Sequence, residues 1–192
     1  MNADELRATL ERAKDRSERN LWLGALLARA ARTGVVIVGG SAIEVYTSGK
    51  YVSDDVDLVG NRKALIEILE EWGFSRKGWF WSRPELKLWV DPVGTHYAGD
   101  EARLGEVSTP YGPVHLAAVE DLIAKRLIGA KVWPRNSNQL FAQAVALATE
   151  YSGVIDWDYV SKLTKRDLAD DLVLELRRRT EAPAARALSS TG

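Results

Sequence analysis

The stretch VIVGGSAIEVYTSGKYVSDDVDLVG, residues 36–60, decides the fold of this chain. It opens with a β-branched run that ends at two glycines and a serine, which is typical of a buried strand followed by a tight turn. The segment SAIEVYTSG then predicts a short helix, and we expect Ser41 and Glu44 to form a capping box at its start. Asp54–Val59 predicts a second strand, in which carboxylates interrupt an apolar run.

Asp55 and Asp57 stand two positions apart on this predicted second strand. Because side chains alternate across a strand, both carboxylates are expected on one face, while Val56 and Leu58 face the other. Two close carboxylates repel each other, and a divalent cation would compensate them. Hard oxygen ligands suit Mg²⁺ or Mn²⁺, so the pattern predicts a metal site.

A third carboxylate follows in GWFWSRPELKLWVDPVG, residues 78–94, which predicts a hairpin. In its second strand Lys87, Trp89 and Asp91 share one face, and we interpret Trp89 as a core residue rather than a base-stacking platform. If this strand lies beside the acidic strand, Asp91 joins the acidic pair. Three carboxylates can hold two metal ions for an in-line phosphoryl displacement.

The turn Gly39–Gly40–Ser41 lies at a predicted helix N-terminus, where backbone N–H groups and the helix dipole favour phosphate. Lys50 and Ser53 precede the aspartates and are expected to contact the same phosphates. Plainer interpretations stay open, because Ser41 can be a simple helix cap and the acids can form an exposed edge. An EF-hand loop starting at Asp55 fails at its fifth and twelfth positions, and the GxGxxG and GxxxxGK[ST] motifs are absent.

Composition limits the function classes. The chain has 192 residues, which fits one domain, or one domain with a small helical appendage. Of these residues 46% are hydrophobic and 28% are charged, and the net charge of −1 does not indicate a broadly basic nucleic-acid coat. It has no cysteine and two histidines, which excludes disulfides and thiolate metal sites. The charged N-terminus is no signal peptide and no apolar run reaches membrane-spanning length, so we expect a cytoplasmic protein without membrane contact.

The pattern along the chain predicts an α+β fold. Residues 1–116 are expected to form a mixed β-sheet flanked by helices, including one N-terminal helix over 3–32 and another over 61–74. A C-terminal helical region is expected over 117–180, with helices at 117–131, 136–151, 157–164 and 166–179. Residues 181–192 are small and polar, which predicts a flexible tail.

The quoted residues resemble a known family. VGGSA…SDDVDLV is similar to the signature of the nucleotidyltransferase (DNA polymerase β-like) superfamily. The order Lys50, Ser53, Asp55, Asp57 resembles that of minimal enzymes related to AbiEii-type toxins and antibiotic nucleotidyltransferases. GFSRKGWFW, LKLWVDPVG, VEDLIAKRLIGAKVW and LFAQAVALATEYSGVIDWDYV extend the resemblance over about residues 30–165.

The resemblance implies a nucleotidyltransferase-like palm that binds ATP or another nucleoside triphosphate with Mg²⁺ or Mn²⁺. The metal ligands and catalytic acids it implies are Asp55, Asp57 and Asp91, with Asp91 as third acid or base. The nucleotide-binding residues are predicted to be Gly39, Gly40, Ser41, Lys50, Ser53, Lys87, Lys125 and Arg126. Relatives often carry an acid where this chain has Arg135–Gln139, which has no carboxylate.

The implied reaction transfers a nucleoside monophosphate to a hydroxyl of tRNA, protein or a small molecule and releases pyrophosphate. The alternative is a catalytically silent nucleotide-binding protein, or a toxin–antitoxin-type partner protein, on the same fold. A structural module with an acidic edge is a third hypothesis. A cognate protein partner or a homodimer also stays open, as does the acceptor.

Overall fold

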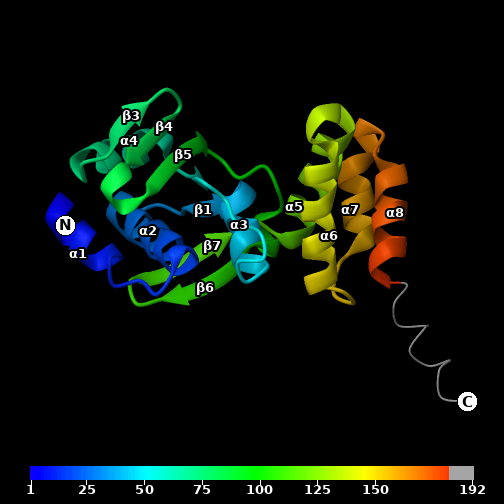
Figure 1. The fold of residues 1–192 in the computed structure, drawn as a ribbon, viewed down its shortest axis with the longest axis horizontal. Coiled ribbons are helices and arrows are strands. Elements are labelled where there is room, and N and C mark those ends of the chain that lie inside the picture. The colour runs from blue at the N-terminus through cyan, green and yellow to red at the C-terminus, as the bar shows by residue number, and fades with distance from the viewer. Residues whose placement is uncertain (182–192) are drawn as a thin grey trace, which may run out of the picture. The chain divides into compact units, whose positions relative to one another are not determined.

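The chain divides into two compact units, Met1–Ala118 and Val119–Gly192, and the computed structural model describes residues 1–181 (Figure 1). The division falls close to the boundary predicted between residues 116 and 117. The predicted flexible tail lies, from residue 182 onward, outside the described residues. Within the described part, no helix is both long and apolar enough to cross a membrane.

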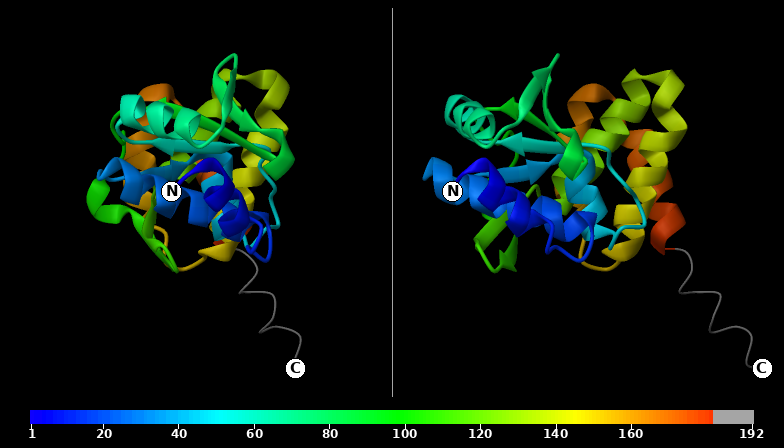
Figure 2. Two further views of the ribbon diagram at one scale, coloured as in Figure 1. Left: turned by 90° about the vertical axis from the view of Figure 1, so that its left-hand side faces the viewer. Right: turned by 60° about the vertical axis from the view of Figure 1, so that its left-hand side comes forward.

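The first unit is built on a seven-stranded sheet in the order β3-β4-β5-β2-β1-β7-β6. The strands are β1 Val36–Val38, β2 Val56–Val59, β3 Ser75–Lys77, β4 Phe80–Arg83, β5 Leu88–Gly94, β6 Gly105–Thr109 and β7 Gly112–Leu116. β1 pairs parallel with β7 and β2 pairs parallel with β5, whereas the other neighbours are antiparallel. The sheet is therefore mixed, which confirms the predicted α+β class. Figure 2 shows the β3–β4 hairpin at one edge of it.

Four helices accompany this sheet: α1 Ala3–Leu10, α2 Arg16–Ala31, α3 Gly39–Tyr46 and α4 Arg62–Glu71, with 3₁₀ turns η1 Pro84–Leu86 and η2 Glu101–Arg103. The single helix predicted over 3–32 is wrong. Asp15 caps a second helix, since its carboxylate accepts a hydrogen bond from the backbone N–H of Glu18 at 2.8 Å. The chain therefore turns between α1 and α2.

The two faces of the sheet carry different side chains. Ile37, Leu58 and Val90 are fully buried on the face against which α2 and α4 pack. The residues that alternate with them, Asp57 and Asp91 among them, point to the opposite face. The helices thus bury the apolar face and leave the acids on the other.

Gly24 lets α2 approach the sheet closely. A Cβ at this position would lie 2.9 Å from Val114 Cγ2 and 3.0 Å from Ile37 Cδ1. Glycine inside a helix costs about 1 kcal/mol relative to alanine. The close contact with the sheet explains why this helix interior contains one.

We predict that Gly24→Leu lowers the free energy of unfolding by about 1–3 kcal/mol, because the added atoms overpack the interface between α2 and the sheet. Urea unfolding of the purified chain measures this. Gly34→Ala is the matched control, because a Cβ at Gly34 meets nothing within 4 Å and the residue has no left-handed φ. Equal losses in the two variants would refute the packing role of Gly24.

The second unit is helical, as predicted. Its elements are α5 Val119–Val132, η3 Pro134–Asn136, α6 Ser137–Glu150, α7 Trp157–Thr164, η4 Lys165–Asp167 and α8 Asp170–Glu181. The predicted bounds of α7 are confirmed. α8 begins later than predicted, because Leu168 adopts a left-handed φ of 54° after the 3₁₀ turn and separates the two helices.

Candidate active site

The acids of the first unit lie on two neighbouring strands. β2 and β5 run parallel, and their register places Asp57 directly opposite Asp91, with Val56 opposite Val90. Residues paired in this way project to the same face of a sheet. The predicted neighbourhood of the two strands is therefore confirmed, and two carboxylates stand side by side on the face that α2 and α4 do not cover.

Asp55 lies one residue before β2, which begins at Val56 rather than at the predicted Asp54. Two serines hold it in place. The Ser53 hydroxyl donates to Asp55 Oδ1 at 3.2 Å, and the Ser41 hydroxyl donates to the Asp55 backbone carbonyl. Both serines are almost fully buried, and Ser41 belongs to α3. The segment of residues 53–55, which we call the acidic loop, is therefore held in place by α3.

The electrostatics of Asp91 depend on its surroundings. Burial raises the pKa of Asp91, the nearby Asp55 carboxylate raises it further, and Arg62 lowers it in part. Burial and a neighbouring carboxylate both disfavour the charged form of an acid, and a cation bound beside it would favour that form. Oxygen donors of this kind suit Mg²⁺ or Mn²⁺, so the donor set fits such an ion. Across residues 1–181, however, no three His, Asp or Glu side chains are gathered as a metal-binding group, and the metal site stays a prediction.

The glycine turn closes on these acids. Gly39 has a φ of +62°, and a Cβ there would lie 1.8 Å from Asp57 Oδ2. A Cβ at Gly40 would lie 2.5 Å from the Ser53 hydroxyl oxygen. Only glycine fits at Gly39, since the backbone is left-handed and the carboxylate occupies the space of a side chain. The first turn of α3 therefore lies against Asp57.

The capping box predicted from Ser41 and Glu44 is wrong, because α3 begins at Gly39 with Val38 as its N-cap. The N-cap residue Val38 makes no side-chain capping hydrogen bond. The first N–H groups of a helix have no partner within the helix and favour an anion. Ser41 instead binds the Asp55 carbonyl. Glu44 is buried, with 3% of its surface exposed, and binds residues outside its own helix.

The basic residues predicted to bind the nucleotide belong to different elements of the chain. Lys50 is exposed in the turn after α3. Lys87 is exposed too, but it adopts a left-handed φ of 51° just before β5, so the strand face predicted for it is wrong. Lys125 and Arg126 lie on α5 in the second unit, where Arg126 Nε donates to Gln143 Oε1. Their contacts with phosphate stay a prediction.

A pocket of about 300 Å³ lies beside the acidic loop and is lined by Asp54, Asp55, Phe80 and Trp89. Trp89 is 37% exposed, so its interpretation as a core residue is wrong. The sequence did contain a signal for this exposure: Trp89 shares a strand face with Asp91, and α2 and α4 do not cover that face. Phe80 gave no such signal, since it lies within the aromatic run of residues 79–81, in which apolar and polar residues do not alternate.

This fold is found in solved nucleotidyltransferase structures. The chain resembles the solution structure of the antibiotic-resistance factor ANT(2'')-Ia with a TM-score of 0.53 and 16% identity, over 93% of this chain and 99% of that one. It resembles the crystal structure of ANT(2'')-Ia with adenylyl-2''-tobramycin with a TM-score of 0.51 and 18% identity, over 77% and 94%.

A third similar structure is an antigenic nucleotidyltransferase-like protein from Paracoccidioides brasiliensis, with a TM-score of 0.54 and 12% identity over 90% of this chain and 94% of that one. No family model matches the sequence, and no curated protein is significantly similar to it. At these identities the likeness establishes the fold alone: the chain has the fold seen in these solved nucleotidyltransferase structures. The resemblance to AbiEii-type toxins stays a prediction.

Proposed function

We propose that this chain is a metal-dependent nucleotidyltransferase. It transfers a nucleoside monophosphate from a nucleoside triphosphate to an acceptor hydroxyl and releases pyrophosphate. The observation that carries the proposal is the in-register pairing of Asp57 with Asp91, directly beside the left-handed turn at Gly39. The likeness to solved nucleotidyltransferases supports it at the level of the fold.

The residues of the candidate site have defined roles in this reaction. The N–H groups at the start of α3 would bind the triphosphate. Asp55, Asp57 and Asp91 would hold Mg²⁺ or Mn²⁺, which when bound supplies positive charge against the triphosphate. The acceptor oxygen bonds to the α-phosphorus while the bond from that phosphorus to the bridging oxygen breaks. Asp91, whose pKa is raised, takes the proton of the acceptor hydroxyl.

The acceptor in this proposal is a small molecule that carries positive charge. The pocket beside Asp55 offers two carboxylates and two aromatic side chains, Phe80 and Trp89. Carboxylates and aromatic faces both attract cations, whereas they repel the phosphates of a nucleic acid. ANT(2'')-Ia has been solved with adenylyl-2''-tobramycin, which is consistent with a small acceptor on this fold. Among the predicted acceptors, tRNA and protein are therefore the less favoured.

Thermal unfolding with each of the four nucleoside triphosphates, with and without Mg²⁺, tests the proposal. A ligand at about 100 times its dissociation constant stabilises the native state by roughly 2.7 kcal/mol. We expect a Mg²⁺-dependent stabilisation by at least one triphosphate in the wild-type chain. The Asp55→Ala/Asp57→Ala variant is expected to lose it, because the acids that compensate the metal charge are gone.

Transfer itself is then followed with the α-labelled triphosphate and three acceptors: polyhydroxylated amines, tRNA and an unfolded protein. Label on the amine supports the proposed acceptor, and label on tRNA or protein overturns that choice while keeping the reaction. Binding without any transfer points to the silent nucleotide-binding protein or the toxin–antitoxin-type partner. No stabilisation by any triphosphate refutes the proposed function.

A further inference from the structure

Glu44 is the buried acid of the first unit that the proposed reaction does not use. It is the one charged residue of α3, and only 3% of its surface is exposed. A buried carboxylate is unfavourable unless it is paired and hydrogen-bonded. Its partners therefore show what it does.

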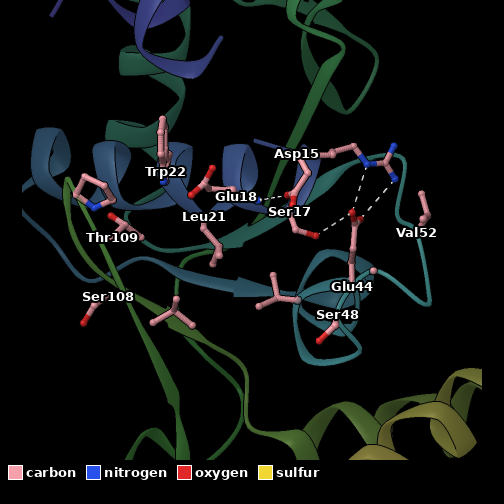
Figure 3. A pocket seen from close by; sticks show the side chains of 15 residues that line it. Asp15, Ser17, Glu18, Leu21, Trp22, Glu44, Ser48, Val52, Ser108 and Thr109 are labelled. Carbon is pink, nitrogen blue, oxygen red and sulfur yellow. Dashed lines mark hydrogen bonds and ion pairs between the residues drawn. The ribbon is translucent and has the colours of Figure 1, made fainter. Parts of the chain in front are cut away.

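The partners come from two other segments of the chain. Glu44 Oε1 accepts a hydrogen bond from the Ser17 hydroxyl at 3.1 Å, and Oε2 accepts one from the Ser53 backbone N–H at 2.9 Å. The Arg16 guanidinium lies 3.5 Å from both carboxylate oxygens. Figure 3 shows the hydrogen bond between Ser17 and Glu44, which both line a pocket. Glu44 thus joins the start of α2 to the loop that precedes β2.

That loop carries the proposed metal ligand Asp55. Ser53 lies before β2, where its N–H donates to Glu44 Oε2 and its hydroxyl donates to Asp55 Oδ1. The path from Glu44 to the Asp55 carboxylate therefore runs through one residue. The Arg16 guanidinium forms an ion pair with Glu44 at 3.5 Å and also lies 4.0 Å from Asp54 Oδ1 in the same loop.

We propose that Glu44, supported by Arg16 and Ser17, is a positioning residue that sets the orientation of the Asp55 carboxylate through Ser53. This inference rests on the proposed function, because it concerns the binding of the metal–nucleotide complex. Groups that orient metal ligands typically change metal affinity or activity by 10–100-fold when they are replaced. Glu44 does not line the pocket beside Asp55, and in this proposal it acts through its hydrogen bond to Ser53.

The test measures the Mn²⁺ dissociation constant in the presence of a saturating triphosphate, together with urea unfolding of the same samples. Glu44→Gln is expected to weaken Mn²⁺ binding at least tenfold, because the charge pair with Arg16 and the hold on Ser53 are impaired. Arg16→Gln is the second variant, since its side chain is 30% exposed and tolerates replacement more readily. It is expected to weaken Mn²⁺ binding as well.

Arg83→Met is the matched control for a merely structural role. Arg83 is also buried, and its guanidinium donates to the Ala3 and Trp72 carbonyls and to Glu85, none of which is a proposed site residue. It is expected to lower the unfolding free energy without changing Mn²⁺ affinity. The positioning role of Glu44 is overturned if Glu44→Gln and Arg16→Gln also lose stability but keep wild-type Mn²⁺ affinity. Failure of the wild-type chain to bind Mn²⁺ and triphosphate refutes the proposed function instead.

Discussion

Gly39→Ala is expected to reduce nucleotidyl transfer at least a hundredfold. Its new Cβ would lie 1.8 Å from Asp57 Oδ2, so the carboxylate must move by more than an ångström. A displacement of about 1 Å at reacting groups can cost a factor of roughly 10² in rate. The left-handed backbone, with φ at +62°, adds about 1–2 kcal/mol of strain for any residue with a side chain. Steady-state transfer to the acceptor identified above measures the first effect, and urea unfolding the second.

Gly49→Ala separates the two causes. Gly49 also has a left-handed φ, +78°, but a Cβ there meets nothing within 4 Å. Its alanine variant should therefore show the strain alone, with a loss of about 1–2 kcal/mol in unfolding free energy and transfer close to the wild-type rate. If Gly39→Ala transfers as fast as Gly49→Ala, the turn is not part of the active site.

The sequence predicted the features of this site that depend on local pattern. Two glycines after a β-branched run predict the turn at Gly39. In β5, Leu88 and Val90 alternate with Trp89 and Asp91, and this alternation predicts which residues face the covered side. The same alternation puts Asp57 of β2 on the face opposite Val56 and Leu58. The sequence could therefore place Asp57 and Asp91 on one face if the two strands are neighbours, but alternation alone does not fix which residues pair.

Features that depend on distant partners could not be predicted. Glu44 looked like a helix cap, because the partners that bury it, Arg16 and Ser17, lie 28 and 27 residues away in the sequence. Strand β3 has the polar sequence Ser75–Lys77, which carries no apolar alternation, and it forms only because β4 lies beside it. Tertiary context overrides local propensity in both cases.

Local backbone changes without a glycine signal were also missed. The sequence pattern assigns Lys87 to a strand. In the structure Lys87 adopts a left-handed conformation, because the short 3₁₀ turn that begins at Pro84 ends there. The break between α1 and α2 falls among charged residues that favour helix on either side, and only the cap at Asp15 marks it. The position of such turns is determined by where the next buried segment must pack, which the local sequence does not show.

Asp91→Asn is expected to change activity and stability in opposite directions. Transfer should fall by about 10²–10⁴, the usual contribution of a positioned acid or base. In the absence of metal, the unfolding free energy at neutral pH should rise. Burial and the Asp55 carboxylate raise the folded-state pKa of Asp91 above its unfolded value, so its charged form opposes folding. This unfavourable contribution is absent below the unfolded pKa and grows as pH rises through the folded pKa. Urea unfolding in the presence of EDTA, from pH 4 to pH 7, measures it.

Glu67→Gln provides the control, because Glu67 is an exposed carboxylate on α4 that forms a surface ion pair with Lys63 at 3.9 Å. Its loss should cost less than about 1 kcal/mol and leave transfer unchanged. Adding Mn²⁺ and triphosphate should reverse the order of stability, since the wild-type chain gains binding energy that Asp91→Asn forfeits. A site selected for catalysis rather than stability shows this reversal. If Asp91→Asn instead unfolds more easily without metal and still transfers the nucleotide, Asp91 is a structural acid and the catalytic centre must be sought elsewhere.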